Sequence, residues 1–386
     1  CDLVITSYAL LQRDLEAAYL DKTFGVVVLD EAQHIKNRQT RNAKAAKQLT
    51  SVQKLVLTGT PVENSVADVW SIFDFLLPGY LGPYDAFRAT TQEVIEAGGP
   101  EGRAEQEKLH RKLHPFILRR LKKTVAKDLP DKIVKVAYCP MTEEQQRWYN
   151  QLLADARGRI GDMVKAKGFA KSRMEILALL MRLRQVASHL ELLKEYREKQ
   201  GARRTGASTT DGGSALSGKL EVFLELLDEA IDGGHRVLVF SQFVSMLTIL
   251  RRELAARGIR YCYLDGETKD RLGACRTFNT DASIPLFLIS LHAGGTGLNL
   301  TGADMVVHFD PWWNPAVEAQ ATDRAHRIGQ KKTVYVVKLI AQDSVEERVL
   351  ALQQKKQLVI DATVGTTDEA AVQKLTYDDI RSILGY

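Results

Sequence analysis

Short apolar runs and helix-like stretches alternate in the first part of this chain. The runs occupy residues 2–8, 24–29 and 54–58, and many of their residues are β-branched. Stretches with a helical spacing of apolar residues, at 9–20 and 40–49, separate them. Strands that are apolar throughout are typical of parallel sheets covered on both faces. The pattern therefore predicts a doubly wound α/β segment.

The same alternation returns in the second half of the chain. Helical patterns fill the gaps between further apolar runs, which occupy residues 237–240, 261–264, 286–289, 305–309 and 334–339. These runs predict a second doubly wound lobe with a parallel sheet. Ligands of such sheets collect at the carboxyl ends of the strands, so the residues that follow each run are the first candidates for function.

A helical region separates the two sheet-forming parts. A capping box at Thr142 and Gln145 begins one of its helices. A second, apolar helix is predicted at 174–193, and we expect its Met174 to lie in the hydrophobic core. Residues 201–218 have no apolar periodicity and predict a flexible linker. We therefore expect five segments, which are the first lobe (1–78), a helical insertion (79–200), the linker (201–218), the second lobe (219–342) and a C-terminal helix with a tail (343–386).

Composition narrows the class of protein. Of the 386 residues 45% are hydrophobic and 26% are charged, which is ordinary for a globular protein, and a net charge of +5 permits a polyanionic partner. The four cysteines are scattered without a C-x-x-C pair, which indicates a reducing compartment and no structural zinc. No apolar run approaches ~18 residues and there is no signal peptide, so we expect no membrane association.

Two polar clusters follow strands of the first lobe. Asp30 and Glu31 come directly after the run at 24–29, and residues 58–61 (T-G-T-P) follow the next run. Adjacent carboxylates at a strand end can divide the work of phosphate chemistry: Asp30 can hold a hydrated Mg²⁺ and Glu31 can polarise an attacking water. The alternative is that both residues simply cap the next helix, but the apolar strand and the T-G-T-P segment favour the site.

Two arginines near the end of the second lobe form a candidate phosphate clamp. If residues 320–330 are helical, Gln320, Arg324 and Arg327 fall at i, i+4 and i+7 on one face. Ala321, Ala325 and Ile328 then form the face that packs on a sheet. Paired guanidiniums suit a polyphosphate, whereas a solvated basic helix face is the plainer alternative.

Glycines supply one candidate phosphate contact and one false one. Gly294, Gly295 and Gly297 follow the run at 286–289 and allow close approach of the backbone. Residues 213–220 nearly match the phosphate-binding motif G-x-x-x-x-G-K-[ST], but Leu220 has no hydroxyl for Mg²⁺ and no apolar strand precedes the motif. We therefore expect a helix to begin at residues 217–219.

A basic stretch follows the helical pattern at 86–113. Residues 108–127 contain eight lysines and arginines and no acid before residue 128. Such a strip can contact phosphates of a nucleic acid, or it can be a basic surface helix with some of its residues pinning the two lobes together. The sequence leaves both possibilities open.

Several motifs together carry a family resemblance. Asp30-Glu31-Ala32-Gln33 resembles the DEAD/DEAH box of superfamily II helicase-like ATPases, and residues 57–61 resemble their motif III. The glycine loop, the P-W-W-N-P segment at 311–315 and the R-A-H-R-I-G-Q run at 324–330 resemble motifs V and VI of Swi/Snf-like ATPases. The resemblance extends from Asp2 to about residue 355. The residues at 311–318 (P-W-W-N-P-A-V-E) are more similar to those of bacterial members than to those of eukaryotic ones.

The resemblance implies two RecA-like lobes that bind ATP and Mg²⁺ between them, and a C-terminal helix that braces the first lobe. The implied catalytic residues are Glu31, Gln320 and the arginine fingers Arg324 and Arg327. The implied contacts to nucleotide and metal are Asp30, Gly295, Gly297, Arg324 and Arg327. The implied contacts to nucleic acid are Thr6, Ser7, Thr60, Thr296, Asn299 and Trp313. For Trp312 we expect packing between prolines instead.

The implied function is ATP-dependent translocation on double-stranded DNA, which displaces or remodels DNA-bound proteins such as RNA polymerase. The alternatives are a strand-separating DNA or RNA helicase and a non-catalytic scaffold that binds DNA or RNA polymerase. The family's phosphate-binding loop would lie before Cys1, so we expect this chain to be cut from a longer protein and to hydrolyse ATP poorly alone. We expect a cytoplasmic, nucleoid-associated protein, or a nuclear one if the source is eukaryotic.

Overall fold

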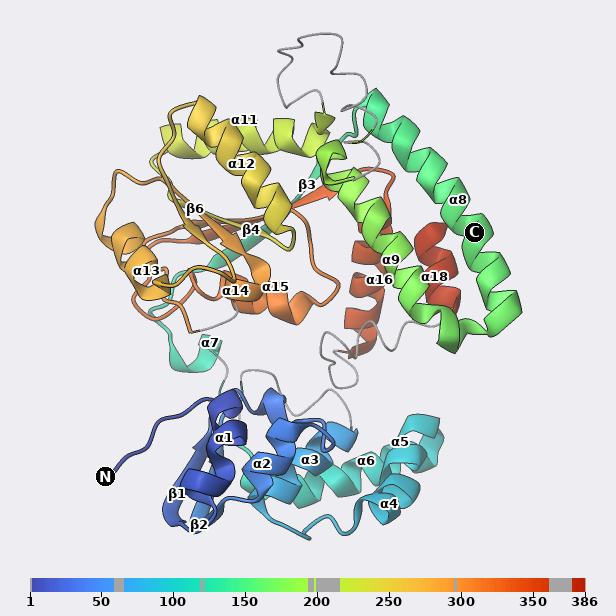
Figure 1. Ribbon diagram of the computed structural model, residues 1–386, viewed down its shortest axis with the longest axis vertical. Helices are drawn as coiled ribbons and strands as arrows, with labels where there is room; N and C mark the ends of the chain where they lie inside the picture. The colour runs from blue at the N-terminus through green and yellow to red at the C-terminus, as the bar shows by residue number, and fades with distance from the viewer. Residues whose placement is uncertain are drawn as a thin grey trace. The chain divides into compact units, whose positions relative to one another are not determined.

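The computed structural model describes residues 2–58, 66–118, 120, 122–193, 198, 216–294, 297–360 and 377–385. The chain forms two compact units, one from residues 1–121 and 359–370 and the other from residues 122–358 and 371–386 (Figure 1). Each unit has its own parallel sheet and hydrophobic core, which confirms the predicted α/β class. Thr60, Gly295, Thr296 and residues 201–215 of the predicted linker lie outside the described residues.

The first unit begins with a small sheet. As predicted, β1 (Thr23–Leu29) and β2 (Thr50–Val56) pair in parallel. The prediction of a strand at residues 2–8 is wrong, because residues 2–7 have no regular structure and α1 (Tyr8–Asp14) begins directly after them. The other helices are η1 (Leu15–Tyr19), η2 (Ala32–Ile35), α2 (Arg41–Lys47), α3 (Val66–Leu76), α4 (Tyr84–Phe87), η3 (Arg88–Gln92), α5 (Glu93–Ala97), α6 (Gly99–Leu113) and η4 (His114–Phe116).

Side chains of this sheet alternate between a covered and an open face. Val27 and Leu29 are buried in a cluster with alanines of α2 and with Ile72 of α3. Their neighbours Val26 and Val28 are 53% and 51% exposed. The expectation that these strands are covered on both faces is therefore wrong for the described residues, where the helices that share this cluster leave the other face open.

Helices α3 to α6 form the rest of the first unit. Val69, Trp70 and Phe73 of α3 are buried against Leu109 and Leu113 of α6, and the predicted helical pattern at 86–113 is confirmed. Lys47 of α2 forms an ion pair with Asp74 of α3 at 2.9 Å. The unit thus combines a sheet layer with a helical extension.

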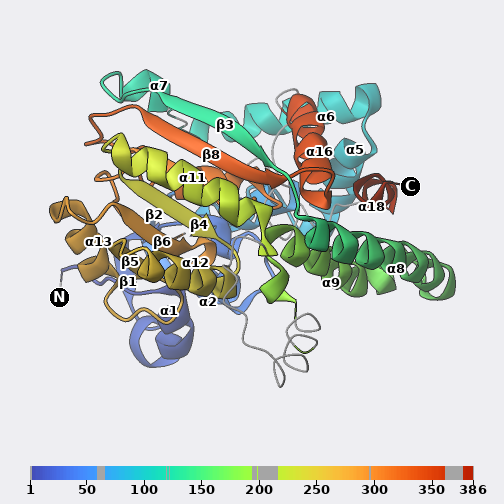
Figure 2. The same cartoon turned by 90° about the horizontal axis from the view of Figure 1, so that it is seen from above.

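The second unit contains a six-stranded parallel sheet. Its order is β3-β8-β7-β4-β6-β5, and Figure 2 shows β3 beside β8. The five predicted strands are confirmed as β4 (Val237–Ser241), β5 (Tyr261–Leu264), β6 (Leu286–Ser290), β7 (Met305–His308) and β8 (Val334–Ala341). The sixth, β3 (Lys132–Cys139), was not predicted, and it pairs with β8 over its whole length.

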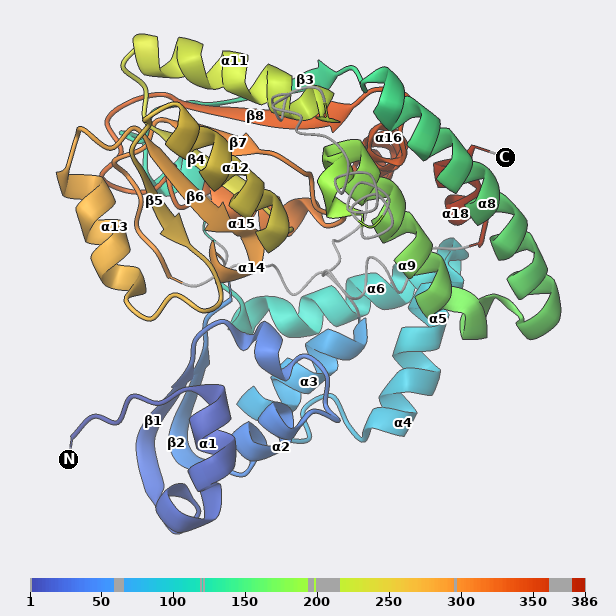
Figure 3. The same ribbon diagram turned by 45° about the horizontal axis from the view of Figure 1, so that its top comes forward.

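Both faces of this sheet are covered. Alternate residues of β4, such as Val237 and Val239, pack with α11 (Gly218–Asp232) and α12 (Val244–Ala256). The residues between them, Leu238 and Phe240, pack with α13 (Arg271–Thr280) and with residues near the end of α15 (Pro315–Thr322) on the other face (Figure 3). Alternate residues of β4 are therefore buried on opposite faces of the sheet, which is what the apolar runs predicted for a doubly wound lobe.

A helical module completes the second unit. It consists of α8 (Glu143–Lys167), α9 (Phe169–Ser188), α16 (Val345–Ile360) and α18 (Tyr377–Leu384), which share one core cluster. The predicted capping box at Thr142 and Gln145 is confirmed. Met174 is 76% exposed, so its predicted core position is wrong, whereas Leu180 and Leu183 are buried. The short helices are α7 (Lys122–Val125), η5 (Leu190–Leu192) and α14 (Leu291–Gly294).

Candidate functional site

A strained turn follows β1 at the predicted carboxylate pair. Glu31 has φ 49° and ψ 53°, the left-handed conformation that side chains other than glycine rarely adopt. Such a backbone costs on the order of 1–3 kcal/mol and persists only where its surroundings hold it. The amide of Ala32 donates to the carbonyl of Leu57 at 3.0 Å, so the turn is fixed to the end of β2.

The two carboxylates of this turn have different partners. Asp30 Oδ1 accepts the amide N–H of Glu31 at 2.9 Å, and Asp30 is exposed. Glu31 Oε2 accepts Gln33 Nε2 at 2.8 Å and is half-buried. An exposed carboxylate with oxygen ligands to offer fits a Mg²⁺ ion, which takes one or two carboxylates and completes its shell with water and phosphate.

The predicted nucleic-acid contacts of the first unit lie just before α1. Thr6 and Ser7 are both exposed. Ser7 is the N-cap of α1 and its hydroxyl accepts the N–H of Leu10 at 3.3 Å. Both residues are therefore accessible at the start of a helix whose first residue, Tyr8, contacts the carboxylate turn through a hydrogen bond from its hydroxyl to the Asp30 carbonyl.

The arginine segment is not the helix that its spacing predicts. α15 ends at Thr322, and turns follow through residue 329, so Arg324 and Arg327 do not extend the helix face of Gln320. Tighter turns follow the helix, because the amides of Arg324 and Ala325 donate to carbonyls three residues earlier, and the carbonyl of Arg324 accepts the amide of Leu300 at 3.0 Å. Ala321 and Ala325 are buried as predicted. Ile328 is 81% exposed, so its predicted packing on the sheet is wrong.

The two arginines differ in their surroundings. Arg324 is only 7% exposed. Arg327 is exposed, and its Nη1 donates to the carbonyl of Leu298 at 3.2 Å. The two arginines lie in one turn, one buried and the other exposed.

Gln330 fixes the end of the arginine segment. Its buried Nε2 donates to the carbonyls of Thr301, Ala303 and Ala325 at 3.2, 2.7 and 3.2 Å. Its Oε1 accepts the amides of Lys331 and Lys332, both at 2.9 Å. Sequence reasoning did not select Gln330, although a glutamine that follows the R-A-H-R-I-G run could have been recognised as a candidate anchor.

Lys122 of the basic stretch, and two residues that follow the stretch, also contact the arginine segment. Lys122 forms an ion pair with Asp323 at 2.6 Å, and Lys132 lies 3.8 Å from the same carboxylate. His326 Nε2 lies 2.7 Å from the carbonyl of Pro130. Lys122 therefore anchors structure within the second unit, and both interpretations of the basic stretch stay predictions.

The other ligand contacts predicted in the second unit differ in their surroundings. Gly297 has φ 50° and is exposed, and Asn299 is exposed while its carbonyl accepts Asn279 Nδ2 at 2.9 Å. Trp313 is half-buried against the helical module, with the Arg184 guanidinium 5.2 Å from its ring centroid. The ring of Trp312 packs edge-on to His292, at 5.2 Å between centroids.

A buried ionic cluster lies where β4 and β7 end, and sequence reasoning missed it. Lys219 Nζ pairs with Glu346 at 2.5 Å, and the side chains are 0% and 1% exposed. Arg184 is buried beside them and donates to Gln242 Oε1 at 3.1 Å. Lys219 is the lysine of the false phosphate-binding motif. The predicted helix start at 217–219 is confirmed, since α11 begins at Gly218 with Ser217 as its N-cap.

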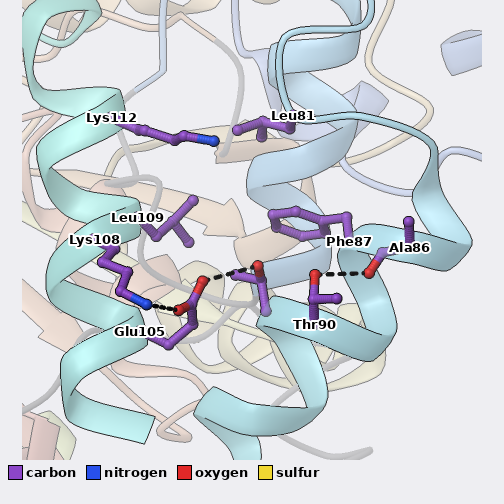
Figure 4. A pocket seen from close by; sticks show the side chains of 9 residues that line it. Leu81, Ala86, Phe87, Thr90, Glu105, Lys108, Leu109 and Lys112 are labelled. Atoms are coloured by element: carbon purple, nitrogen blue, oxygen red, sulfur yellow. Dashed lines mark hydrogen bonds and ion pairs between the residues drawn. The ribbon is translucent and has the colours of Figure 1, made fainter. Parts of the chain in front are cut away.

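A pocket of about 270 Å³ lies in the first unit between α6 and the α4–η3 segment (Figure 4). Thr91 Oγ1 donates to Glu105 at 3.2 Å, and Glu105 pairs with Lys108 at 3.0 Å. Phe87 and Leu109 line it with apolar surface. Lys108 and Lys112 of the basic stretch also line it, whereas the predicted catalytic residues Glu31, Gln320, Arg324 and Arg327 do not.

The described ranges offer neither a cluster of metal ligands nor a membrane-spanning helix. They contain no group of three or more His, Cys, Asp or Glu side chains that could hold a metal ion together. No helix within them is both long enough and apolar enough to cross a membrane.

Known protein families account for most of the chain. Residues 1–192 match a model of the SNF2-related domain, and residues 218–329 match a model of the helicase conserved C-terminal domain. The first match includes the carboxylate turn, and the second includes the glycine loop and the arginine segment.

Curated relatives are longer than this chain. An uncharacterized ATP-dependent helicase of Mycoplasma genitalium is 36% identical over 364 residues, which are 94% of this chain and 33% of the relative. The TATA-binding protein-associated factor MOT1 of Saccharomyces cerevisiae is 34% identical over 405 residues, which are 94% of this chain and 22% of the relative. The chain thus spans about a third or less of these relatives.

A solved structure matches the fold as well. The Sulfolobus solfataricus SWI2/SNF2 ATPase core in complex with dsDNA is 34% identical, with a TM-score of 0.53. The match covers 98% of this chain and 76% of that chain.

Proposed function

The chain belongs to the SNF2-related family, and on that basis we propose that its full-length protein hydrolyses ATP and moves along double-stranded DNA. The observation that carries this proposal is the fixed turn at the end of β1, where a strained Glu31 stands beside Asp30. Strain held at a strand end is typical of a functional site. The DNA substrate is supported by the similar Sulfolobus core, which was solved with dsDNA.

The proposed roles divide the chemistry among the side chains. Asp30 would hold Mg²⁺, which supplies positive charge to the phosphates when it is bound. Glu31 orients and polarises the attacking water. Arg324 and Arg327, assisted by Gln320, stabilise the charge of the transition state, a contribution of ~10³–10⁵ in rate for an arginine finger. Gly295 and Gly297 would contact the nucleotide through backbone N–H groups.

The proposed nucleic-acid contacts are Thr6, Ser7, Thr60, Thr296, Asn299 and Trp313. Hydroxyl and amide groups of this kind bind phosphate and sugar and give little sequence specificity. A motor that works on DNA of any sequence needs this property. We propose that the motor displaces or remodels a DNA-bound protein, in keeping with the name of the relative MOT1, a TATA-binding protein-associated factor.

The test is ATP turnover by the full-length protein with and without duplex DNA. Glu31→Gln keeps the size of the side chain and removes the base, so turnover should fall by about 10² or more. Glu16→Gln is the matched control, because Glu16 is an exposed glutamate of the same unit and should leave turnover unchanged. Unchanged turnover in Glu31→Gln would sink the assignment of Glu31 as the base.

A second assay separates translocation from strand separation. The full-length protein is given ATP with a DNA triplex and, separately, with a forked duplex. Translocation on double-stranded DNA predicts displacement of the third strand without opening of the duplex. Opening of the duplex without triplex displacement would favour the strand-separating alternative.

A further inference from the structure

Tyr8 links the start of α1 to the carboxylate turn. Its hydroxyl donates a hydrogen bond to the backbone carbonyl of Asp30 at 2.8 Å. Its ring lies 5.1 Å from the ring of His34, which belongs to η2 directly after the turn. Tyr8 is half-buried and packs on the core cluster of the first unit. One side chain therefore contacts both ends of the turn.

The bond from Tyr8 acts on one particular peptide group. The carbonyl of Asp30 and the amide of Glu31 belong to the same planar peptide. The amide donates to Asp30 Oδ1 at 2.9 Å, and the carbonyl accepts from Tyr8. The peptide plane between the two carboxylates is thus held from both of its ends. Because Glu31 is in the left-handed region, its backbone needs such outside support.

The Tyr8 hydroxyl remains a donor at neutral pH. Burial, together with the negative charges of Asp30 and Glu31, raises the pKa of Tyr8 to about 12. The hydrogen bond to the Asp30 carbonyl therefore does not depend on pH in the range where the protein would work. Its strength depends on where α1 places the ring.

The placement of α1 begins with the predicted nucleic-acid contacts. Ser7 caps the helix, and Tyr8 is its first residue. A DNA strand whose phosphates bind Thr6 or Ser7 therefore contacts the backbone directly before Tyr8. No other residue between these two and β1 makes a described hydrogen bond to the Asp30–Glu31 peptide.

We infer that Tyr8 is a positioning residue for ATP hydrolysis. Its hydroxyl orients the Asp30–Glu31 peptide, and it makes the geometry of both carboxylates depend on how nucleic acid holds Thr6 and Ser7. This role rests on the proposed function, since it requires that Glu31 acts on ATP and that Thr6 and Ser7 contact DNA. Tyr8 itself touches neither ligand.

Tyr8→Phe removes the hydroxyl and keeps the ring. In the full-length protein we expect the DNA-stimulated kcat to fall roughly 3–10-fold, which corresponds to loss of one hydrogen bond, with KM for ATP nearly unchanged. The matched control is Tyr19→Phe, because Tyr19 packs on Phe24 in the same unit and its hydroxyl has no hydrogen bond among the described residues. A purely structural role for Tyr8 would instead lower Tm and scale the rates with and without DNA equally.

A second measurement uses the unmodified full-length protein. Hydrogen exchange of the Glu31 amide should change when duplex DNA is added, because the inference ties this peptide to the DNA contacts. An unchanged exchange rate would overturn the inference, as would a normal DNA-stimulated kcat in Tyr8→Phe. If Glu31→Gln abolishes turnover in either case, the proposed function stands and only the role of Tyr8 fails. Full turnover in Glu31→Gln would overturn the proposed function itself.

Discussion

Lys219 shows how one residue can carry a misleading motif. It follows a glycine at the spacing of a phosphate-binding loop, yet its ammonium is fully buried and pairs with Glu346. The missing hydroxyl at Leu220 and the missing strand were sufficient to reject the motif from the sequence. The partner could not be predicted, because Glu346 lies far away in the chain and only the fold brings the two together.

Removal of the Lys219 charge should destabilise the second unit. Lys219→Met keeps the length of the side chain but leaves the Glu346 carboxylate buried without its closest cation, and Glu346 Oε1 already has no hydrogen-bond partner. We expect a loss of about 3–5 kcal/mol in the free energy of unfolding, measured by urea denaturation of the chain. The double variant Lys219→Met/Glu346→Gln should recover part of it, because no net charge stays buried. A single variant within ~1 kcal/mol of the parent would contradict this.

Two buried groups of the same unit respond to pH in opposite directions. Burial raises the pKa of Asp310 to about 6, although Arg184 and Lys219 act against it. Burial lowers the pKa of His308 to about 4. Acidification from pH 7 to 4 therefore favours the folded state through Asp310, whose stabilisation is present at low pH and lost as pH rises through 6. The same acidification disfavours the folded state through His308, which takes up its proton more easily when unfolded.

Single variants should separate these two contributions. Each is on the order of 3 kcal/mol, at about 1.4 kcal/mol per pKa unit, so they nearly cancel in the parent. In His308→Gln the free energy of unfolding should rise as pH falls from 6.5 to 4, and in Asp310→Asn it should fall. Thermal melts over this pH range measure both slopes. Equal slopes in the two variants would show that neither group titrates as its burial implies.

The candidate site illustrates what residue patterns can and cannot fix. The carboxylates were found because they follow an apolar strand, and β1 confirms that strand. The arginines were placed on a helix because their spacing is helical, but α15 ends at Thr322, and in the turn that follows the carbonyl of Arg324 accepts the amide of Leu300. Such bonds come from residues outside the window that a periodicity samples, so no local pattern could show them.

At the scale of elements, strands covered on both faces were the most predictable. β4, β6 and β7 are buried at every position, and His308 is the one polar residue inside their predicted apolar runs. β3 was missed because Lys132 and Lys135 interrupt its apolar residues and it lies at the edge of the sheet. Its partner β8 follows about two hundred residues later, so the pairing that makes it a strand is not a local property.

The C-terminal helix α18 has a structural role that the sequence did not reveal. Ile380, Ile383 and Leu384 are buried in the cluster shared with α8 and α9. Arg157 of α8 donates to the carbonyl of Leu384 at 2.6 and 3.0 Å and to that of Gly385 at 3.1 Å. These bonds satisfy carbonyls that the end of a helix leaves without partners.

Loss of the Arg157 bonds should release α18. Arg157→Met keeps most of the aliphatic contact, and we expect a cost of about 1–3 kcal/mol, because charged donors to carbonyls are lost. Hydrogen exchange should speed up at residues 377–385 before the rest of the unit is affected. Arg159→Met on the exposed side of the same helix is the control and should change neither. Equal exchange in both variants would argue that apolar packing alone holds α18.

At the scale of the whole molecule, the predicted family is confirmed, while the proposed active site draws on residues of both units. Each unit holds its own part in place by local bonds: Gln33 holds Glu31 in the first, and Gln330 holds the arginine segment in the second. Both parts can therefore be formed without ATP. Within the described ranges, neither part supplies a loop of N–H donors with a lysine for the nucleotide phosphates.

This shortage leads to a prediction for the 386-residue chain itself. Its one near match to a phosphate-binding loop ends in Lys219, whose ammonium is committed to Glu346 and to the carbonyl of Phe309 and cannot reach a ligand. We expect the chain alone to hydrolyse ATP at a small fraction of the rate of the full-length protein, with or without duplex DNA. The measurement is steady-state turnover of both proteins at equal concentration, with a urea denaturation curve to show that the chain is folded. Robust DNA-stimulated turnover by the folded chain would mean that other residues of this chain bind the phosphates, and Lys219→Met would then show whether Lys219 is among them.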